Sequence, residues 1–300
     1  MEVTRGGTVE SRHRVHAAAV RDGELVAAVG NPHLVTFMRS AAKPLQALPL
    51  VRAIADLPPD ELAIACASHL ARPDQLAPVA ALLARARASA ERDLECGPAG
   101  HPPERIKHNC SGKHAAMLAL CRARSWERTG YRLAGHPAQE AMLDELAGAA
   151  EVDAETIPTA VDGCGVVTFA LPLERMAHAF SRLTERDGGG RVTSAMRARP
   201  ELIRGEGSAD TNLMRALPGW VAKGGAEGLL CAASPDGTGI ALKCEDGTSR
   251  ALKPALAALL ASLGVELDET FRRVSVKNSR DEVVGEIVSG TTIGRQHAFS

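Results

Sequence analysis

Aromatic residues are scarce in this chain, and neither sign of charge is in excess. Phe, Trp and Tyr make up 3% of its 300 residues, which leaves few rings for stacking on nucleic-acid bases. The 35 basic and 36 acidic side chains give a net charge of −1, so we expect no positive surface for nucleic acid or for an anionic membrane. Nucleic acid is therefore not an expected partner.

Long apolar runs are also missing. The longest windows, such as residues 255–263, fall far short of the roughly 20 residues that cross a bilayer. The opening residues, MEVTRGGTVESRHR, have neither the apolar core nor the small-residue cleavage pattern of a secretory signal. These features predict a protein without a membrane span that stays in the cytoplasm.

The cysteines do not form the pattern of a disulfide framework. There are seven, an odd number, scattered at positions 66, 96, 110, 121, 164, 231 and 244. In a reducing compartment such thiols are expected in the core or at a metal site.

Strand-like runs lie towards both ends of the chain. Alternating or β-branched residues with turn signals predict strands over 9–20, 25–29, 228–233, 239–244, 274–279 and 282–288. Asp22-Gly23 predicts a tight hairpin turn between the first two. Because strands must pair to satisfy their backbone groups, we expect the N-terminal hairpin and the C-terminal strands to share one antiparallel sheet.

The middle of the chain has mostly helical spacing. Apolar residues three and four apart predict helices over 40–54, 73–88, 111–124, 137–150 and 173–184, and a further helix follows over 252–263. We therefore predict an α+β fold in one domain, 1–300, with a sheet lobe (about 1–39 plus 220–300) and an inserted helical lobe (about 40–219). A cleft is expected between the lobes.

The stretch RSAAKP places Ser40 and Lys43 one turn apart at the start of a predicted helix. A lysine three residues after a serine can reach the hydroxyl, and the positive end of the helix dipole favours a developing oxyanion. The spacing predicts a serine nucleophile with a lysine base. The alternative is a helix-capping serine followed by a surface lysine.

The stretch HNCSGKHAAM crowds Cys110, Lys113 and His114 into another predicted helix start, where the pKa of a thiol should be lowered. The stretch VDGCG adds Asp162 and Cys164 on a glycine-rich turn. Two thiols suggest a soft-metal site, zinc being the commonest, although zinc usually takes three or four protein ligands. The alternative is a capping loop with core cysteines.

Two further stretches carry polar residues next to apolar runs. Ser68 and His69 follow the run 62–67, and Lys223 enters the first strand of the returning sheet. A lysine that faces the cleft can tune a serine. Taken alone, His69 is more often a satisfied histidine, and Lys223 a solvated charge at a strand end.

Taken together, several stretches resemble the asparaginase II family, the zinc-associated L-asparaginases similar to the Rhizobium etli inducible type. The matching stretches, in order along the chain, are RSAAKP, CASH, HNCSGKHAAML, VDGCG, GEGSADTNLMRA and AKGGAEG. The resemblance implies a serine β-lactamase-like fold, which agrees with the antiparallel sheet and helical lobe expected above. It also implies a homodimer.

The resemblance also implies roles for individual residues. The catalytic pairs are Ser40 with Lys43 and Ser68 with Lys223. The zinc ligands correspond to Cys110, Lys113 and Cys164, with Asp162 and a water nearby, and Arg39 and His114 line the substrate pocket. One family member has a cysteine where this chain has Asp210, which makes the metal a weaker implication than the serines.

The expected activity is hydrolysis of L-asparagine to L-aspartate and ammonia by a serine nucleophile next to a zinc site. Which serine attacks stays open, since Ser68 can instead act in a proton relay. The alternatives are a glutaminase or other small-amide amidohydrolase, because one methylene is worth only about 1–3 kcal/mol in a pocket, and a non-enzymatic protein that binds an amino acid at a zinc cleft. A β-lactamase is disfavoured because S-D-N and K-T-G are missing.

Overall fold

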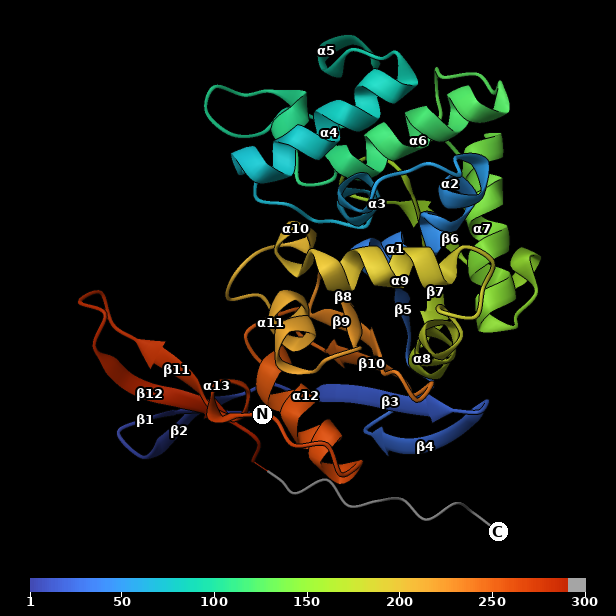
Figure 1. Ribbon diagram of the computed structural model, residues 1–300. Coiled ribbons are helices and arrows are strands. Elements are labelled where there is room, and N and C mark those ends of the chain that lie inside the picture. Colours follow the sequence, from blue (N-terminus) through green and yellow to red (C-terminus); the bar gives the residue numbers. More distant parts are fainter. Residues whose placement is uncertain (291–300) are drawn as a thin grey trace.

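A computed structural model describes residues 1–290 of the chain, and Figure 1 shows its arrangement. The strands are β1 (Glu2–Arg5), β2 (Thr8–Arg12), β3 (Val15–Arg21), β4 (Glu24–Val29), β5 (Val35–Phe37), β6 (Thr159–Val161), β7 (Val167–Pro172), β8 (Val221–Gly224), β9 (Leu229–Ala233), β10 (Gly239–Cys244), β11 (Val274–Lys277) and β12 (Val283–Val288). All pairings among them are antiparallel.

The longer helices are α3 (Pro59–Ala65), α4 (Pro73–Ala86), α6 (Ser111–Arg124), α7 (Pro137–Ala150), α8 (Leu173–Ser181), α9 (Gly189–Ala198), α11 (Ala209–Ala216) and α12 (Leu252–Ser262). The shorter helices are α1 (Lys43–Gln46), α2 (Leu48–Ala53), α5 (Ala90–Asp93), α10 (Pro200–Ile203) and α13 (Glu269–Arg272), with 3-10 turns η1 (Arg39–Ala42), η2 (Arg105–Lys107) and η3 (Ala154–Thr156). The α+β class is confirmed. No helix within the described part is both long and apolar enough for a bilayer.

The five-stranded sheet, in the order β4-β3-β10-β9-β8, joins the two ends of the chain as expected. Its first hairpin turns at Asp22-Gly23, and both residues have positive φ (52° and 82°), as the Asp-Gly signal requires. Lys223 lies on β8, the edge strand of this sheet, opposite Cys231. This edge therefore presents Lys223 to the helices around the candidate site.

Two expectations about the sheet are wrong. The expected strand 9–20 is two strands, because the chain turns at His13-Arg14, and β2 joins a different sheet. That second sheet, in the order β11-β12-β1-β2, also takes the closing hairpin. Figure 1 shows it projecting beside the five-stranded sheet.

The middle of the chain is mostly helical, and the predicted helices 111–124 and 137–150 match α6 and α7. It also holds a third sheet, β5-β7-β6, that the helical spacing did not indicate. The expected helix 40–54 is broken into η1, α1 and α2, since Pro44 and Pro49 each restart the helix at its first positions. The division into a sheet lobe and a helical lobe stays a prediction.

Candidate active site

Two lysine amines meet on one serine hydroxyl. Lys43 Nζ donates a hydrogen bond to Ser68 Oγ at 3.0 Å, and Lys223 Nζ donates to the same oxygen at 3.1 Å. Both lysines are fully buried, and Ser68 is 2% exposed. Lys223 is therefore not a solvated charge at a strand end, and the structure brings three of the four expected catalytic residues together.

Several different elements position these three groups. Lys43 is the first residue of α1, Ser68 follows the end of α3, and Lys223 lies in β8. The backbone N–H of Ser68 donates to Ile203 O at 2.7 Å, and Lys43 Nζ also donates to the carbonyl oxygen of Ala67. These bonds hold Ser68 and Lys43 against each other across 25 residues of sequence.

The charge state of Lys223 is set by its surroundings. Burial lowers the pKa of this amine to about 7, the Asp210 carboxylate opposes the shift, and the Lys43 charge adds to it. Asp210 Oδ2 lies 3.7 Å from Lys223 Nζ and accepts a hydrogen bond from Gly224 N at 2.9 Å. At neutral pH a sizeable fraction of Lys223 is therefore a neutral amine that can accept a proton.

The contact between Asp210 and Lys223 was not expected from the sequence, where Asp210 stood out only because one family member has a cysteine at that position. Asp210 is 2% exposed. Burial raises the pKa of its carboxyl, but Lys223 and the Gly224 N–H outweigh burial, so the net direction is downward. It is a positioning and charge-setting residue for Lys223, and its place in GSADTN gave no signal of that contact.

Ser40 lies in η1 rather than at the start of a long helix. Its side chain is half-buried and makes no hydrogen bond within residues 1–290, so the expected direct contact with Lys43 is not present. The helix that follows is only four residues long, so its dipole contributes little. The Lys43 amine is turned towards Ser68 and Cys110 instead.

The Cys110 thiol lies at the start of α6 and accepts a hydrogen bond from Lys43 Nζ at 3.3 Å. The hydrogen bond from Cys164 lowers its pKa most, burial opposes that, and Lys43 lowers it further, for a net shift well below the ordinary value. Correspondingly, the pKa of Cys164 is raised. The direction of this shift agrees with the lowering expected at a helix start, but its main cause is the Cys164 hydrogen bond.

The three expected metal ligands form one buried group. Lys113 is 3% exposed; burial lowers the pKa of its amine, but Cys164, Cys110 and Asp162 outweigh burial, and the net direction is upward. Two sulfurs and an amine nitrogen thus lie within electrostatic and hydrogen-bonding reach of one another. This donor set fits a soft divalent metal such as zinc.

Arg39 and Asp162 form a partly buried ion pair beside these groups. Arg39 Nε donates to Asp162 Oδ1 at 2.5 Å, and the two side chains are 25% and 8% exposed. Arg39 has a left-handed backbone, with φ of 49°, and its N–H donates to Thr168 Oγ1 at 3.2 Å. A non-glycine residue in this region costs on the order of 1 kcal/mol or more, so packing around β7 holds it there.

His114 is fully buried beside Tyr131. Tyr131 Oη accepts a hydrogen bond from Glu95 N at 2.9 Å and lies 2.7 Å from His114 Nδ1. His114 Nε2 has no hydrogen-bond partner in the described chain. Burial lowers the pKa of His114 well below its usual value, so the ring is neutral. Sequence reasoning missed Tyr131, the only tyrosine of the chain.

His69 is a structural histidine. Its Nδ1 accepts from Ala71 N at 3.2 Å, and its Nε2 lies 2.8 Å from Ser111 Oγ, which itself donates to Ile106 O. Burial lowers the pKa of its ring to about 4. The interpretation as a satisfied histidine fits these contacts.

A second group with metal-ligating atoms lies elsewhere and was not expected from sequence. Potential ligand atoms of His13, Cys244 and Asp246 all lie within 4.8 Å of one another. Arg250 Nε donates to His13 Nε2 at 2.9 Å, which leaves the ring hydrogen on Nδ1, facing Asp246 Oδ2 at 2.5 Å. A metal on Nδ1 would have to displace that hydrogen and the Arg250 contact.

Comparison with known proteins gives a match to one family. The sequence model of the family described as L-asparaginase II matches residues 1–289. No curated protein sequence matches the chain.

Solved structures with a partial likeness are distant in sequence. Native Mglu is 13% identical with a TM-score of 0.49, over 88% of this chain and 68% of its own. SurE with D-Leu is 14% identical with a TM-score of 0.43, over 85% and 72%. A probable glutaminase from Bacillus subtilis complexed with 6-diazo-5-oxo-L-norleucine is 14% identical with a TM-score of 0.33, over 79% of each chain. Nothing about the substrate of this chain follows from them.

Proposed function

The chain belongs to the L-asparaginase II family, and from this premise we propose that it hydrolyses the side-chain amide of L-asparagine through a serine activated by two lysines. The observation that carries the mechanism is the shared hydroxyl of Ser68, which contacts both Lys43 Nζ and Lys223 Nζ. An amidohydrolase of this kind needs a nucleophile, a base for its proton and an acid for the leaving ammonia.

We assign attack to Ser40 and proton relay to Ser68. Ser68 is 2% exposed, which leaves little room for substrate, whereas Ser40 is half-buried and its hydroxyl is not engaged within residues 1–290. Neutral Lys223 can accept the Ser68 proton while Ser68 takes one from the Lys43 ammonium. That transfer leaves Lys43 as a neutral amine. Its amine then turns from Ser68 to the substrate side and becomes the base for Ser40, which lies three residues earlier in the chain.

The chemical steps then balance. Ser40 Oγ forms a bond to the amide carbon, Lys43 takes the hydroxyl proton and returns it to the leaving nitrogen, and ammonia departs from an acyl-enzyme. A water molecule attacks the ester carbon by the same proton route and releases L-aspartate. Apo hydrogen bonds at catalytic centres are often long and tighten with substrate, so the absence of a Ser40–Lys43 bond in residues 1–290 is compatible with these steps.

Recognition of the substrate is assigned to Arg39, Asp162 and His114. The Arg39–Asp162 pair offers one positive and one negative group, which matches the two charges of a free amino acid. The buried His114 ring has an Nε2 with no partner in residues 1–290, and its N–H tautomer there is a neutral donor suited to a carbonyl or carboxylate oxygen. The supports for these roles are the family match and the charges of the three groups.

Zinc is assigned to Cys110, Lys113 and Cys164. When bound, it would supply a fixed positive charge beside the substrate and hold the thiols deprotonated. The protein's own contribution is to bury the donors and keep Asp162 close to them.

The test is ammonia release from L-asparagine and L-glutamine by wild type, Ser40→Ala and Ser68→Ala. We expect wild type to prefer asparagine, Ser40→Ala to lose activity, and Ser68→Ala to be slowed but to retain acyl-enzyme formation. Equal activity on both amides would favour a glutaminase-type selectivity. An inactive wild type, or full activity of Ser40→Ala, would contradict the proposal.

We also propose a homodimer, on the family resemblance, and, as expected from the sequence, a cytoplasmic location. Light scattering of the purified protein tests the first, and cell fractionation of the tagged native protein tests the second. All seven cysteines are free and buried, which fits the expectation of reduced thiols.

A further inference from the structure

A cavity of about 230 Å³ is lined in part by Asp210, the carboxylate that faces Lys223. Its lining comes from the segment 204–210, the turn after β8, the start of β9 and the start of α12. Neither Ser40, Lys43 nor Ser68 lines it. The cavity is smaller than the roughly 300–1,000 Å³ of sites for drug-sized ligands, so it suits a molecule no larger than an amino acid.

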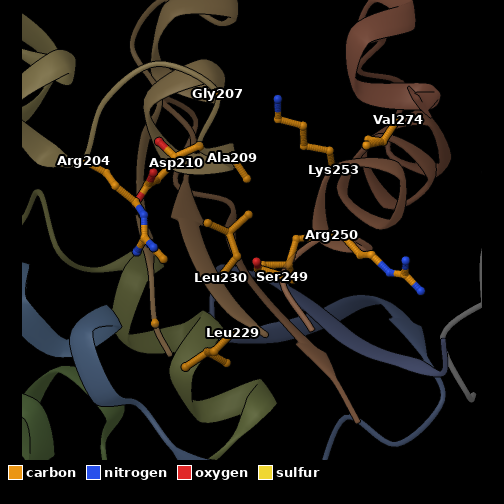
Figure 2. Close-up of a pocket in the computed structure, with 14 residues that line it drawn as sticks. Arg204, Gly207, Ala209, Asp210, Leu229, Leu230, Ser249, Arg250, Lys253 and Val274 are labelled. Atoms are coloured by element: carbon orange, nitrogen blue, oxygen red, sulfur yellow. The ribbon is translucent and has the colours of Figure 1, made fainter. Parts of the chain in front are cut away.

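Two cationic side chains, Arg204 and Lys253, flank this cavity. Figure 2 shows Arg204 and Lys253 on opposite sides, with Leu230 between them and the Arg250 guanidinium directed away. Neither Arg204 nor Lys253 forms a salt bridge within residues 1–290; Lys253 Nζ lies 5.7 Å from the centre of the Phe271 ring and interacts with Asp268 at longer range. An anion in the cavity would gain a charge-assisted contact from Arg204 or from Lys253.

The single carboxylate in the lining is already compensated. Asp210 accepts hydrogen bonds from Gly224 N at 2.9 Å and Thr211 N at 2.9 Å and faces Lys223 Nζ at 3.7 Å. The negative charge of Asp210 is therefore stabilised by these two N–H groups and by Lys223. The starts of α11 and α12, which also line the cavity, add partial positive charge to it.

The rest of the lining is aliphatic. Leu252, which is 4% exposed, and the partly buried Val274 contribute the apolar surface of the cavity, whereas Leu229 and Leu230, which also border it, are fully buried. Phosphate alone would leave that surface unused, whereas a carboxylate on a short aliphatic chain would cover it while its charge meets Arg204 or Lys253.

We propose that this cavity is a second ligand site, which binds a small aliphatic carboxylate between Arg204 and Lys253. It lies one side chain away from Lys223, through Asp210, and is separate from the site of the serines. The assignment does not depend on the proposed amidase activity, because the cavity and its charges stand apart from Ser40 and Ser68.

Calorimetric titration of the full-length protein tests the site with three probes: sodium butyrate, sodium succinate and inorganic phosphate. The variants are Lys253→Gln and Arg204→Gln, and the control is Lys277→Gln, an exposed lysine of β11 outside the cavity. We expect one carboxylate per chain, binding weakened about tenfold or more by either cavity variant, and no change in the control.

Tighter binding of succinate than of butyrate would show that Arg204 and Lys253 each engage one carboxylate, and the reverse order would favour a monocarboxylate. Absence of binding to wild type, equal affinity in wild type and both cavity variants, or phosphate binding as tightly as the carboxylates would overturn the proposal. Because heat rather than turnover is measured, failure here is distinguishable from failure of the proposed activity.

Discussion

Lys223 Nζ lies 3.7 Å from a carboxylate oxygen of Asp210, although both side chains are almost completely buried. The separation is longer than a hydrogen bond, and the amine donates instead to Gly224 O at 2.7 Å and to Ser68 at 3.1 Å. Asp210 thus tunes the amine without capturing its proton. Burial still dominates, which leaves the pKa of Lys223 at about 7.

The first prediction concerns pH. If neutral Lys223 starts the relay, kcat/KM for L-asparagine should rise with pH through about 7, because deprotonation of this amine creates the base. Lys223→Arg keeps a positive charge but cannot lose its proton, so kcat should fall by about 100-fold or more over the whole pH range. A pH–rate profile of both proteins provides the measurement. A wild-type profile that is flat from about pH 6 to about pH 8 would contradict the role of Lys223 as the base.

Asp210→Asn provides the second prediction. The carboxylate raises the pKa of Lys223, so its removal should lower that pKa and move the rising limb of the pH–rate profile to lower pH, by about 1 unit or more. Asn keeps an oxygen that can accept from Gly224 N, which limits the structural damage. Glu206→Gln, an exposed acid nearby, is the matched control and should leave the limb in place. A merely structural role for Asp210 would lower activity without moving the limb.

The sequence was most informative where a local rule decides the structure. Asp22-Gly23 specified its turn, and the apolar spacing of 111–124 and 137–150 specified α6 and α7. It was wrong over 40–54, where Pro44 and Pro49 divide the helix, and it did not indicate the strand over 167–172.

The sequence predicted which residues belong to the candidate site, but not which of them contact one another. The family resemblance assigned catalytic roles to Ser68 and Lys223, which are 155 residues apart in the chain and share a hydrogen bond. The motif spacing paired Lys43 with Ser40 because they are one turn apart, yet the amine turns to Ser68, since tertiary packing rather than helix spacing places it. Tyr131, whose hydroxyl contacts His114 Nδ1, had no sequence signal because it lies 17 residues away, outside the helix that carries His114.

The third prediction tests the packing beneath the thiols. Gly112 in α6 lies so close to α3 that an added Cβ would be 2.3 Å from the carbonyl oxygen of Ile64. Gly112→Ala should therefore lower the free energy of unfolding by about 1–3 kcal/mol, despite the better helix propensity of alanine. Gly97→Ala is the control, because a Cβ there meets nothing within 4 Å. Urea titration of both variants gives the comparison, and equal stabilities would show that α6 can shift away from Ile64.

The fourth prediction decides where a metal binds, since the chain offers two donor groups. Cys110 and Cys164 lie with Lys113, whereas Cys244 lies with His13 and Asp246. At the second group the Arg250 guanidinium donates to the histidine and opposes a cation, so we expect the first group to hold zinc. Both variants are dialysed against zinc, and the bound metal is measured by elemental analysis. Cys110→Ser should lose most of the bound zinc, and Cys244→Ser should keep it. Loss in Cys244→Ser with retention in Cys110→Ser would move the metal to the second group and leave Cys110 and Cys164 as a hydrogen-bonded thiolate–thiol pair.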